Sequence, residues 1–421
     1  MTYDVAFPST LRGRIVLPTS KSLSARALII AALAGDASVT GLSDCDDTRV
    51  LRHALSCRPD TVDVQAAGTA MRFATAYFAT QPGEHTVTGT PRMCQRPIRP
   101  LVDALRALGA AVRYEGEEGF PPLRIAGRRL EGGRVALPAD VSSQYVSALL
   151  MVAPALEQGL ELELQGEVAS RPYIDMTLGL MRHFGARAEW TGSNALRVAP
   201  GGYRRGVHYA VEPDWSAASY WYEMVALSDD AAACIELPGL RRDSLQGDAV
   251  VAELFRPLGV TTEYGRDGVR LRKGPATPGA VAADLAGCPD LGQTLVATCA
   301  LLGRPFRFGG LRSLRIKETD RIAALQTELG RMGCSPATDG ESLWSTATGA
   351  APHRPDGALA TYDDHRMAMA LAPAALRLGP VAIDHPEVVS KSYPAFWDDL
   401  RRVGVRVAPG PIAAAPSSLK A

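Results

Sequence analysis

Two cations and two carboxylates stand within five positions of one another in the segment KETDR. Lys317 and Arg321 are positive, Glu318 and Asp320 are negative, and an apolar helical pattern, IAALQTEL, follows them directly. One interpretation is a solvated first helical turn, because acidic residues favour a helix N-terminus. However, Lys317 and Arg321 would share a helical face, and like charges there repel unless an anion or a carboxylate lies between them. The alternative interpretation is therefore a site that binds an anion.

Lysine is rare in this chain, so the position of each lysine is informative. Only five of the 45 basic residues are lysines. Arginine suits planar anions, whereas lysine supplies a compact charge with a tunable pKa. Three of the five lie in distinctive segments: Lys21 in TSKS, Lys317 in KETDR and Lys391 in SKSYP. We expect these three lysines at a functional site.

The composition argues against several classes of protein. The 45 basic and 45 acidic residues give a net charge of zero, so nothing suggests a surface for nucleic acid or membrane. No apolar run approaches the ~18 residues that span a bilayer, and the start, MTYDVAFPST, lacks the features of a signal peptide. The seven cysteines are odd in number and form no CxxC pair. We therefore expect reduced thiols in a cytoplasm and no structural zinc site. With 421 residues and 46% hydrophobic content, we expect two domains.

The chain repeats itself at an interval of about 74 residues. Five helix-like stretches end at a glycine that an alternating, strand-like run follows, as in LRALGAAVRYE and LRRVGVRVAP. These glycines are separated by 76, 74, 74 and 71 positions: Gly109, Gly185, Gly259, Gly333 and Gly404. Each is predicted to end an amphipathic helix.

A second set of helices is apolar nearly all round and is therefore predicted to be buried. Equivalent positions near their starts are spaced by 47, 74, 73, 76 and 74 residues: Ser22, Thr69, Ser143, Ser216, Gly292 and Arg366. Six units fit the chain, each with one buried helix, one amphipathic helix and several short strands, the first being shortened. This pattern predicts an α/β protein of two three-unit domains, with a linker around residues 207–213.

Small or polar residues precede all six buried helices. Backbone N–H groups and the helix dipole make such N-termini attractive to phosphate and carboxylate, although a capping Ser or Thr alone is usually structural. Several of these starts also carry a cation, and a Pro-rich loop adds another: Lys21, Arg26, Arg72, His365, Arg366 and, from the loop, Arg96. If two domains bring these N-termini face to face, the gap between them would bind anions, with KETDR at its edge.

Eight segments in order resemble the 5-enolpyruvylshikimate-3-phosphate (EPSP) synthase family over nearly the whole chain. They are LPTSKSLSARALIIAALA, AAGTAMRF, PRMCQRPI, VSSQYVSALLM, SRPYIDMTL, KETDRIAALQTEL, YDDHRMAMAL and SKSYPAFWDDL. The resemblance implies an enolpyruvyl transferase fold of two inside-out α/β domains, each with three-fold internal repetition. The lower domain would comprise residues 1–18 and 212–421, and the upper domain residues 19–211.

The resemblance also implies two substrates, phosphoenolpyruvate and shikimate 3-phosphate, and a set of residues for each. Phosphoenolpyruvate would be bound by Lys21, Gly68, Arg96, Gln144, Arg321, Arg366 and Lys391. Shikimate 3-phosphate would be bound by Lys21, Ser22, Arg26, Ser142, Ser143, Gln144, Ser170, Tyr173, Asp290 and Lys317. No metal or cofactor is required, and we expect a cytoplasmic monomer without nucleic-acid or membrane partners.

The implied chemistry needs one acid and one base. A hydroxyl adds to C2 of phosphoenolpyruvate while the methylene carbon takes a proton, and the adduct then loses phosphate. Glu318 matches the family's proton donor, Asp290 in CPDLGQT matches the base on the 5-hydroxyl, and Lys21 would lie where the two substrates meet. We expect Glu318 between Lys317 and Arg321, and Asp320 to orient an arginine or cap the helix.

Two other functions use the same residues. One is the sister transferase of cell-wall synthesis, which performs this chemistry on UDP-N-acetylglucosamine, although SSQY, SRPYI and KETDR argue against it. The other is a binding protein that keeps the anion site but has lost turnover, which intact Glu318 and Asp290 argue against. The sequence departs from the family's usual asparagine at Ala66 and Ser313, where an amide would contact substrate or hold a loop.

Overall fold

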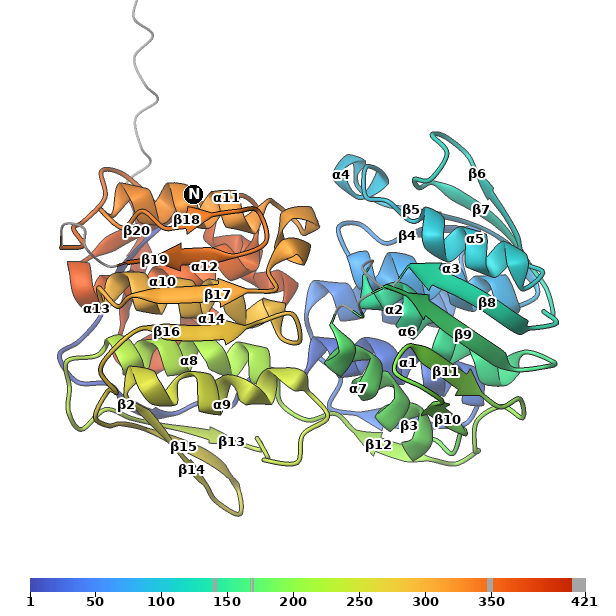
Figure 1. Cartoon of the computed structure of the whole chain (residues 1–421), viewed down its shortest axis with the longest axis horizontal. Coiled ribbons are helices and arrows are strands. Elements are labelled where there is room, and N and C mark those ends of the chain that lie inside the picture. The colour runs from blue at the N-terminus through green and yellow to red at the C-terminus, as the bar shows by residue number, and fades with distance from the viewer. Residues whose placement is uncertain (139–141, 167, 169, 347–350, 411–421) are drawn as a thin grey trace, which may run out of the picture. The chain divides into compact units, whose positions relative to one another are not determined.

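A computed structural model describes residues 1–138, 142–166, 168, 170–346 and 351–410. Residue contacts divide the chain into two compact units. Unit 1 consists of Met1–Pro18, Trp215–Ser244 and Asp248–Ala421, and unit 2 consists of Thr19–Asp214 and Leu245–Gly247. Figure 1 labels the helices and strands of both units. The division into a lower domain of residues 1–18 and 212–421 and an upper domain of residues 19–211 stays a prediction.

Each unit contains three sheets among its described residues. Those of unit 2, in spatial strand order, are β4 (Thr61–Asp63), β5 (Gly83–Thr88), β7 (Leu123–Gly127), β6 (Ala111–Tyr114); β10 (Ala188–Trp190), β11 (Ala195–Val198), β9 (Leu160–Gln165), β8 (Gly133–Pro138); and β12 (His208–Ala210), β3 (Ser38–Thr40). Those of unit 1 are β14 (Val260–Tyr264), β15 (Gly268–Lys273), β13 (Cys234–Pro238), β2 (Arg12–Arg14); β16 (Val281–Asp284), β17 (Phe306–Gly309), β19 (Leu343–Ser345), β18 (Ala337–Thr338); and β20 (Val381–Asp384), β1 (Thr2–Ala6), β21 (Arg406–Pro409).

The strands alternate between buried and exposed residues, as half-buried strands do. In β9 the three leucines of LELELQ are buried and the two glutamates are exposed. Each four-stranded sheet joins one parallel pair, such as β8 with β9, to antiparallel pairs. Because buried and exposed residues alternate along the strands, each sheet has one buried face that can pack against a helix.

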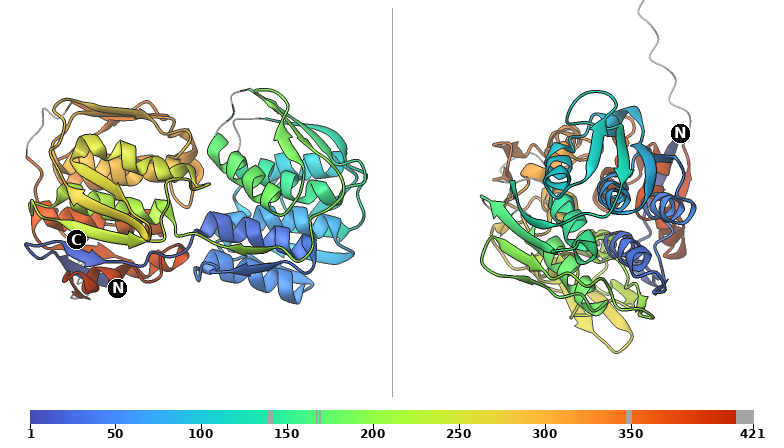
Figure 2. Two further views of the ribbon diagram at one scale, coloured as in Figure 1. Left: turned by 90° about the horizontal axis from the view of Figure 1, so that it is seen from below. Right: turned by 90° about the vertical axis from the view of Figure 1, so that its right-hand side faces the viewer.

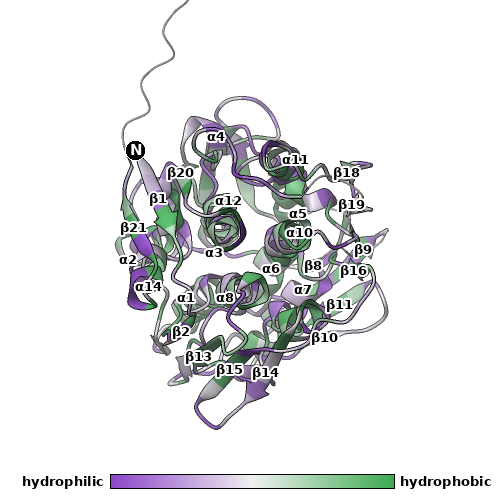
Figure 3. Ribbon diagram, turned by 90° about the vertical axis from the view of Figure 1, so that its left-hand side faces the viewer, coloured by the Kyte–Doolittle hydropathy of each residue, from purple (hydrophilic) through white to green (hydrophobic). Residues whose placement is uncertain are grey.

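The six apolar helices are covered by the sheets of their unit, as predicted. They are α1 (Lys21–Ala34), α3 (Gly68–Thr80) and α6 (Ser143–Val152) in unit 2, and α8 (Trp215–Leu227), α10 (Gly292–Leu301) and α12 (His365–Leu371) in unit 1. All 13 residues of α8 are buried, because the helix has no polar face to present to water. Figure 3 shows α8, α10 and α12 end-on with strands around them, and the right-hand view of Figure 2 faces unit 2, with strands outside several of its helices.

Four amphipathic helices end at predicted glycines. They are α5 (Arg99–Ala107), α7 (Arg171–His183), α11 (Arg321–Arg331) and α14 (Phe396–Arg402), whereas α2 (Asp46–Cys57) of the shortened first unit is followed by Arg58. Gly109, Gly185, Gly333 and Gly404 have φ of 98°, 85°, 81° and 86°, the left-handed conformation that glycine adopts after a helix. The prediction of these four helix ends is confirmed.

The helix predicted before Gly259 is broken into short turns, although Gly259 ends them as predicted, with φ of 82°. Only α9 (Val251–Leu254) is α-helical there, between the 3₁₀ turns η2 (Gly247–Val250) and η3 (Arg256–Leu258). Pro257 has no N–H to donate and disfavours helical geometry at the residue before it, so the helix cannot continue. The remaining short turns are α4 (Pro91–Cys94), η1 (Ala153–Ala155), η6 (Ala372–Ala374) and α13 (Ala375–Leu378).

The predicted linker around residues 207–213 is partly a strand. His208–Ala210 form β12, which pairs in parallel with β3 of the shortened first repeat. The alternating VHYAV provides strand geometry, and β3 lacked any other partner among the described strands. Among the described residues, no helix is both long enough and apolar enough to cross a bilayer.

One residue of α8 conflicts with its buried position. Glu223 is fully buried, and neither carboxyl oxygen has a hydrogen-bond partner among the described residues. Burial raises the pKa of Glu223 well above its ordinary value, because desolvation penalises the charged form. The folded protein therefore holds a proton on Glu223 at pH values where the unfolded chain does not.

Glu223→Gln is expected to remove a pH dependence of stability. Above the ordinary pKa of about 4.3, folding requires Glu223 to keep its proton, so the free energy of unfolding falls by about 1.4 kcal/mol per pH unit up to the folded-state pKa. Glutamine does not titrate, so the stability advantage of the variant should grow as pH rises. Urea unfolding of both proteins between pH 5 and 8 measures this difference, and an advantage independent of pH would contradict it.

Candidate active site

Arg321 is the centre of a charged network in unit 1. It is the first residue of α11, its side chain is 2% exposed, and its guanidinium contacts three carboxylates. Nε donates to Asp364 Oδ2 at 2.7 Å, Nη2 to Glu318 Oε2 at 2.9 Å, and Nη1 to Asp290 Oδ1 at 3.3 Å. Burial lowers the pKa of Arg321, but attraction to these carboxylates outweighs burial and raises it. Arg321 is therefore a permanent cation held in one orientation.

Asp290 lies among three cations from different segments. It belongs to the 3₁₀ turn η4 (Pro289–Leu291), directly before the buried helix α10. Arg366 Nη2 donates to its Oδ2 at 2.8 Å, and Lys317 Nζ lies 3.9 Å from its Oδ1, the atom that Arg321 also contacts. Arg366 also reaches Ser216 Oγ at 3.2 Å and Tyr220 Oη at 3.3 Å on α8. Asp290 thus links the starts of three helices, α10, α11 and α12.

Glu318 lies between Arg321 and Lys391. Lys391, at the end of the 3₁₀ turn η7 (Pro386–Lys391), places its Nζ 2.9 Å from Glu318 Oε1. Glu318 interacts with both cations of its own segment, because it pairs with Arg321 and its charge also attracts Lys317. Lys317 precedes α11 in extended conformation, and Asp290 is a second carboxylate that both Lys317 and Arg321 contact.

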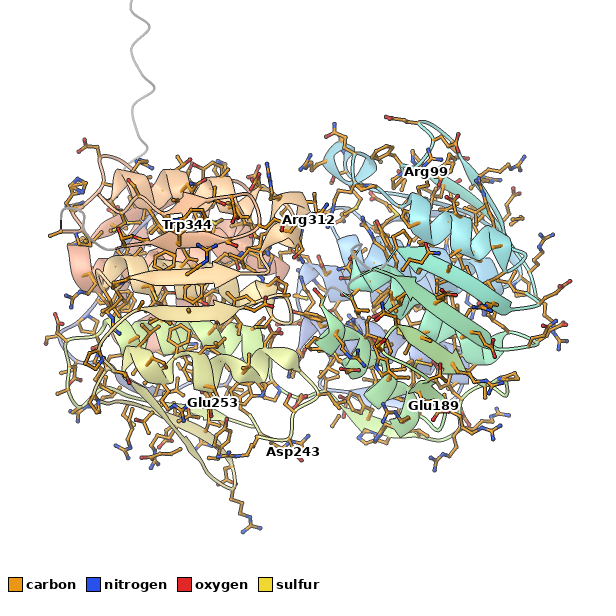
Figure 4. All side chains as sticks on the ribbon, viewed as in Figure 1. Arg99, Glu189, Asp243, Glu253, Arg312 and Trp344 are labelled. Carbon is orange, nitrogen blue, oxygen red and sulfur yellow. The ribbon has the colours of Figure 1, made fainter. Side chains whose placement is uncertain are left out.

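Asp320 ends the loop and begins the helix. Its Oδ1 accepts from the backbone N–H of Ala323 at 3.1 Å, and its Oδ2 accepts from Arg315 Nε at 3.3 Å. It therefore both caps α11 and orients an arginine, the two roles expected for it. The 3₁₀ turn η5 (Arg312–Ile316) leads into this loop, and Figure 4 labels its first residue, Arg312.

Lys317 has an altered acidity. Desolvation lowers its pKa, and the attraction of Asp290 opposes this effect while Arg321 repels the charge. A lysine whose pKa is lowered in this way loses its proton more readily than one in water.

Unit 2 carries a second group of predicted site residues, at the N-termini of its buried helices. Lys21 is the first residue of α1, and its Nζ lies 3.2 Å from Asp47 Oδ2 at the start of α2. Ser142 caps α6 by accepting from the N–H of Gln144, whose side chain donates to Thr69 Oγ1 on α3 at 3.1 Å. These contacts set the starts of α1, α3 and α6.

Gly68 and Arg96 are in close contact at the start of α3. A Cβ atom on residue 68 would lie 2.6 Å from Arg96 Nη1, so only glycine leaves room for this guanidinium. Arg72 was expected to face an anion, but it is buried and donates to Gly68 O at 3.2 Å and Pro97 O at 3.0 Å. Arg72 thus ties the loop that carries Arg96 to α3.

The predicted residues of α1 and α7 meet at Arg26. Arg26 is buried and donates to Ser22 O at 2.9 Å and Tyr173 O at 3.4 Å. Ser170 stands directly before α7 with φ of 54°, a left-handed conformation that costs free energy for a residue other than glycine. Each unit therefore gathers its own predicted residues: unit 1 contains Asp290, Lys317, Glu318, Arg321, Arg366 and Lys391, and unit 2 contains Lys21, Ser22, Arg26, Gly68, Arg96, Ser142, Ser143, Gln144, Ser170 and Tyr173.

The sequence pattern of the EPSP synthase (3-phosphoshikimate 1-carboxyvinyltransferase) family matches residues 5–58 and 52–400. This chain belongs to the EPSP synthase family. Its relatives include the 3-phosphoshikimate 1-carboxyvinyltransferase of Bacteroides fragilis strain ATCC 25285, 52% identical over 97% of this chain and 100% of that protein. The enzyme of the same name from Bordetella parapertussis is 38% identical over 94% of this chain and 96% of that protein.

Solved structures share the fold of this EPSP synthase family member. EPSP synthase from Acinetobacter baumannii has a TM-score of 0.79 at 21% identity and covers 98% of this chain and 100% of its own. The enolpyruvyl transferase NikO from Streptomyces tendae has a TM-score of 0.71 at 19% identity and covers 97% and 99%. The predicted enolpyruvyl transferase fold is confirmed.

Two carboxylates of this family member contact site residues but were not predicted from the sequence. Asp364 is fully buried and forms an ion pair with Arg321. It also caps α12 by accepting from the N–H of Arg366 at 2.9 Å. Asp47 contacts Lys21. The signals were the adjacent aspartates in YDDHRM and DCDDTRV, which stand directly before or at the start of a helix. His365 is also buried, with Nδ1 3.7 Å from Asp364 Oδ1.

Gly68→Ala is expected to weaken the binding of phosphoenolpyruvate. The new methyl group would overlap the Arg96 guanidinium, and a flexible side chain moves more cheaply than the backbone. We expect the KM for phosphoenolpyruvate to rise about tenfold while thermal stability changes little. Steady-state kinetics and a melting curve measure both quantities. An unchanged KM would show that Arg96 does not need its present position.

Proposed function

We propose that the residues described above perform the reaction of the EPSP synthase family in defined roles. The reaction transfers the enolpyruvyl group of phosphoenolpyruvate to the 5-hydroxyl of shikimate 3-phosphate and releases phosphate. It belongs to the shikimate pathway, which leads to chorismate and the aromatic amino acids. Each substrate carries one phosphate and one carboxylate, so binding both requires several fixed cations.

Phosphoenolpyruvate is assigned mainly to cationic side chains. Its phosphate and carboxylate suit arginine forks, and lysines add point charges. The assigned residues are Lys21, Gly68, Arg96, Gln144, Arg321, Arg366 and Lys391. The observation that carries this assignment is the network around Arg321, in which Asp290 and Glu318 hold Arg321, Arg366 and Lys391 within one cluster.

Shikimate 3-phosphate is bound mainly by hydroxyl groups and helix N-termini. Helix N-termini with serine side chains offer neutral donors to phosphate and to ring hydroxyls. The assigned residues are Lys21, Ser22, Arg26, Ser142, Ser143, Gln144, Ser170, Tyr173, Asp290 and Lys317. Lys21 and Gln144 belong to both sets, which places the reacting groups of the two substrates near them.

Asp290 takes the proton of the 5-hydroxyl, and Glu318 gives a proton to the methylene carbon of phosphoenolpyruvate. The C–O bond to C2 forms in this step, and a tetrahedral adduct with a methyl group results. In the second step the two carboxylates exchange roles: Glu318 takes a proton back from the methyl group to restore the double bond, the C–O bond from C2 to phosphate breaks, and Asp290 gives its proton to the departing phosphate. Lys21, Arg321 and Arg366 stabilise the negative charge of the adduct and of the departing phosphate.

The substrate anions compete with Asp290 and Glu318 for the same cations. In the protein alone, Arg366 and Arg321 hold Asp290, while Arg321 and Lys391 hold Glu318. Phosphoenolpyruvate is assigned to three of these cations. Its binding therefore loosens the two carboxylates from their partners, so that they can exchange protons when both substrates are present.

Release of inorganic phosphate from phosphoenolpyruvate tests this function. Release should depend on shikimate 3-phosphate and should not occur with UDP-N-acetylglucosamine as the acceptor. Release that follows the sugar nucleotide would identify the cell-wall reaction instead. Binding of shikimate 3-phosphate without release would identify a binding protein, and either result would overturn the proposal.

The surroundings of the enzyme complete the proposal. We propose that it works as a monomer in the cytoplasm, on small-molecule substrates alone, and without nucleic acid, membrane, metal or cofactor. The zero net charge supports this interpretation, because basic surfaces usually accompany nucleic-acid or membrane binding.

A further inference from the structure

Arg26 has an unusual environment for a buried cation. The ion pairs between described residues include no carboxylate partner for it, and all its hydrogen-bond acceptors are neutral. Burial lowers the pKa of Arg26 to about 10, which still leaves it charged at neutral pH. A buried charge without a counter-ion is costly, so its neutral partners must be placed accurately.

Two hydroxyl groups supply the side-chain contacts of Arg26. Its Nε donates to Thr177 Oγ1 at 2.7 Å, and its Nη2 donates to Ser147 Oγ at 3.1 Å. The two hydroxyls lie 2.8 Å apart, and both residues are fully buried. Neither residue belongs to the substrate-binding sets above.

The direction of each hydrogen bond in this cluster follows from counting hydrogens. Thr177 donates its single hydroxyl hydrogen to Tyr173 O at 2.8 Å, so Ser147 must donate to Thr177. Thr177 Oγ1 therefore accepts from both Arg26 and Ser147, and its two lone pairs are filled. Loss of this one oxygen would leave two buried donors without acceptors.

The cluster joins the three helices that carry the proposed shikimate 3-phosphate residues. Arg26 lies one turn after Ser22 on α1, Ser147 one turn after Ser143 on α6, and Thr177 one turn after Tyr173 on α7. The described contacts use four of the five N–H groups of Arg26, which leaves one on Nη1. Nη1 also binds the carbonyl of Ser22, so this last donor lies at the level of the helix starts.

We propose that Thr177 and Ser147 are positioning residues for shikimate 3-phosphate. By fixing Arg26, they direct its remaining Nη1–H toward an oxygen of the substrate. They also hold the starts of α1, α6 and α7 in fixed positions relative to one another. They do not touch the substrate themselves. This inference rests on the proposed function of Arg26.

The test compares Thr177→Val with Thr177→Ser. Valine has the shape of threonine without the acceptor, whereas serine keeps the hydroxyl. Thr177→Val is expected to raise the KM for shikimate 3-phosphate about tenfold, while kcat and the KM for phosphoenolpyruvate change little. Thr177→Ser is expected to keep the KM of the original protein.

Thr75→Val is a matched control in the same unit. Thr75 is also fully buried, and its hydroxyl also bonds the carbonyl four residues earlier, Met71 O at 2.7 Å, but it does not contact Arg26. If Thr75→Val raises the KM for shikimate 3-phosphate as much as Thr177→Val does, the role of Thr177 is structural and the inference is overturned. An unchanged KM in Thr177→Val overturns it as well.

Two further variants separate the possible failures. Ser147→Ala removes the second acceptor and should also raise this KM, which provides a second test should Thr177→Val not fold. Arg26→Lys tests the proposed function itself: an unchanged KM would remove Arg26 from the binding set. A raised KM in Arg26→Lys with no effect of Thr177→Val or Ser147→Ala would refute the positioning role alone.

Discussion

Replacement of Glu318 by glutamine is expected to lower kcat about 10³-fold, within the range for loss of a general acid. Glutamine keeps the size of the side chain and can still accept from Arg321, but it cannot give a proton to carbon. Phosphate release in the presence of both substrates measures the loss. Since Glu318 is not assigned to shikimate 3-phosphate, calorimetry should show that this substrate still binds with nearly unchanged affinity.

The pair Glu318→Gln and Asp290→Asn separates the two proposed proton transfers. Asp290 is assigned both to the base role and to shikimate 3-phosphate, so its replacement should lower kcat and also weaken binding of that substrate. Glu318→Gln should affect kcat alone. If Glu318→Gln retains turnover within about tenfold of the original protein, another group supplies the proton and the assignment fails.

Replacement of Asp364 by asparagine is expected to destabilise the protein by about 2 kcal/mol, because buried Arg321 loses two hydrogen bonds to a charged partner but keeps Glu318 and Asp290. Asp364 and Arg321 are 0% and 2% exposed, so the guanidinium cannot turn to water when the carboxylate is lost. Asparagine still caps a helix well, so the start of α12 should persist and the effect reports mainly on charge. Denaturant unfolding measures the stability, and the KM for phosphoenolpyruvate should rise as Arg321 loses its orientation.

Asp399→Asn is the matched control for Asp364→Asn. Asp399 is also 0% exposed and also pairs with an arginine, Arg402, at 2.5 Å. However, the Arg402 side chain is 64% exposed, so water can solvate its guanidinium after asparagine replaces the carboxylate. The control should cost less stability and leave the KM for phosphoenolpyruvate unchanged. Equal costs for the two variants would show that burial of the arginine does not determine the effect.

The helices and their ends could be predicted well from the sequence. A helix that is apolar all round must be buried, and a glycine after the last apolar turn ends a helix, because both rules depend on neighbouring residues only. The six buried helices and the ends at Gly109, Gly185, Gly333 and Gly404 follow these rules. The stretch before Gly259 also ends at its glycine, but Pro257 prevents a continuous α-helix there.

The partners of the charged residues could not be predicted in the same way. KETDR indicated contacts among neighbours in the sequence, but it could not show that the distant Lys391 also pairs with Glu318 or that the distant Asp290 pairs with Arg321. Arg72 looked available to an anion, yet it holds the loop of Arg96. Charge interactions act through space and fall off with distance and solvent screening, so they depend on how helices pack.

The sequence by itself determined the family, the repeated helices and the residue types that can bind anions, because these are properties of local pattern and composition. Only the tertiary structure decided that Asp364 pairs with Arg321, that Asp290 contacts three cations and that Arg26 donates hydrogen bonds to two hydroxyl groups. These contacts join segments that are distant in the chain, such as Arg26 and Thr177, which are 151 positions apart, and packing of the helices brings them together. An ion pair or hydrogen bond forms only within a few ångströms, a distance that no local sequence rule can specify.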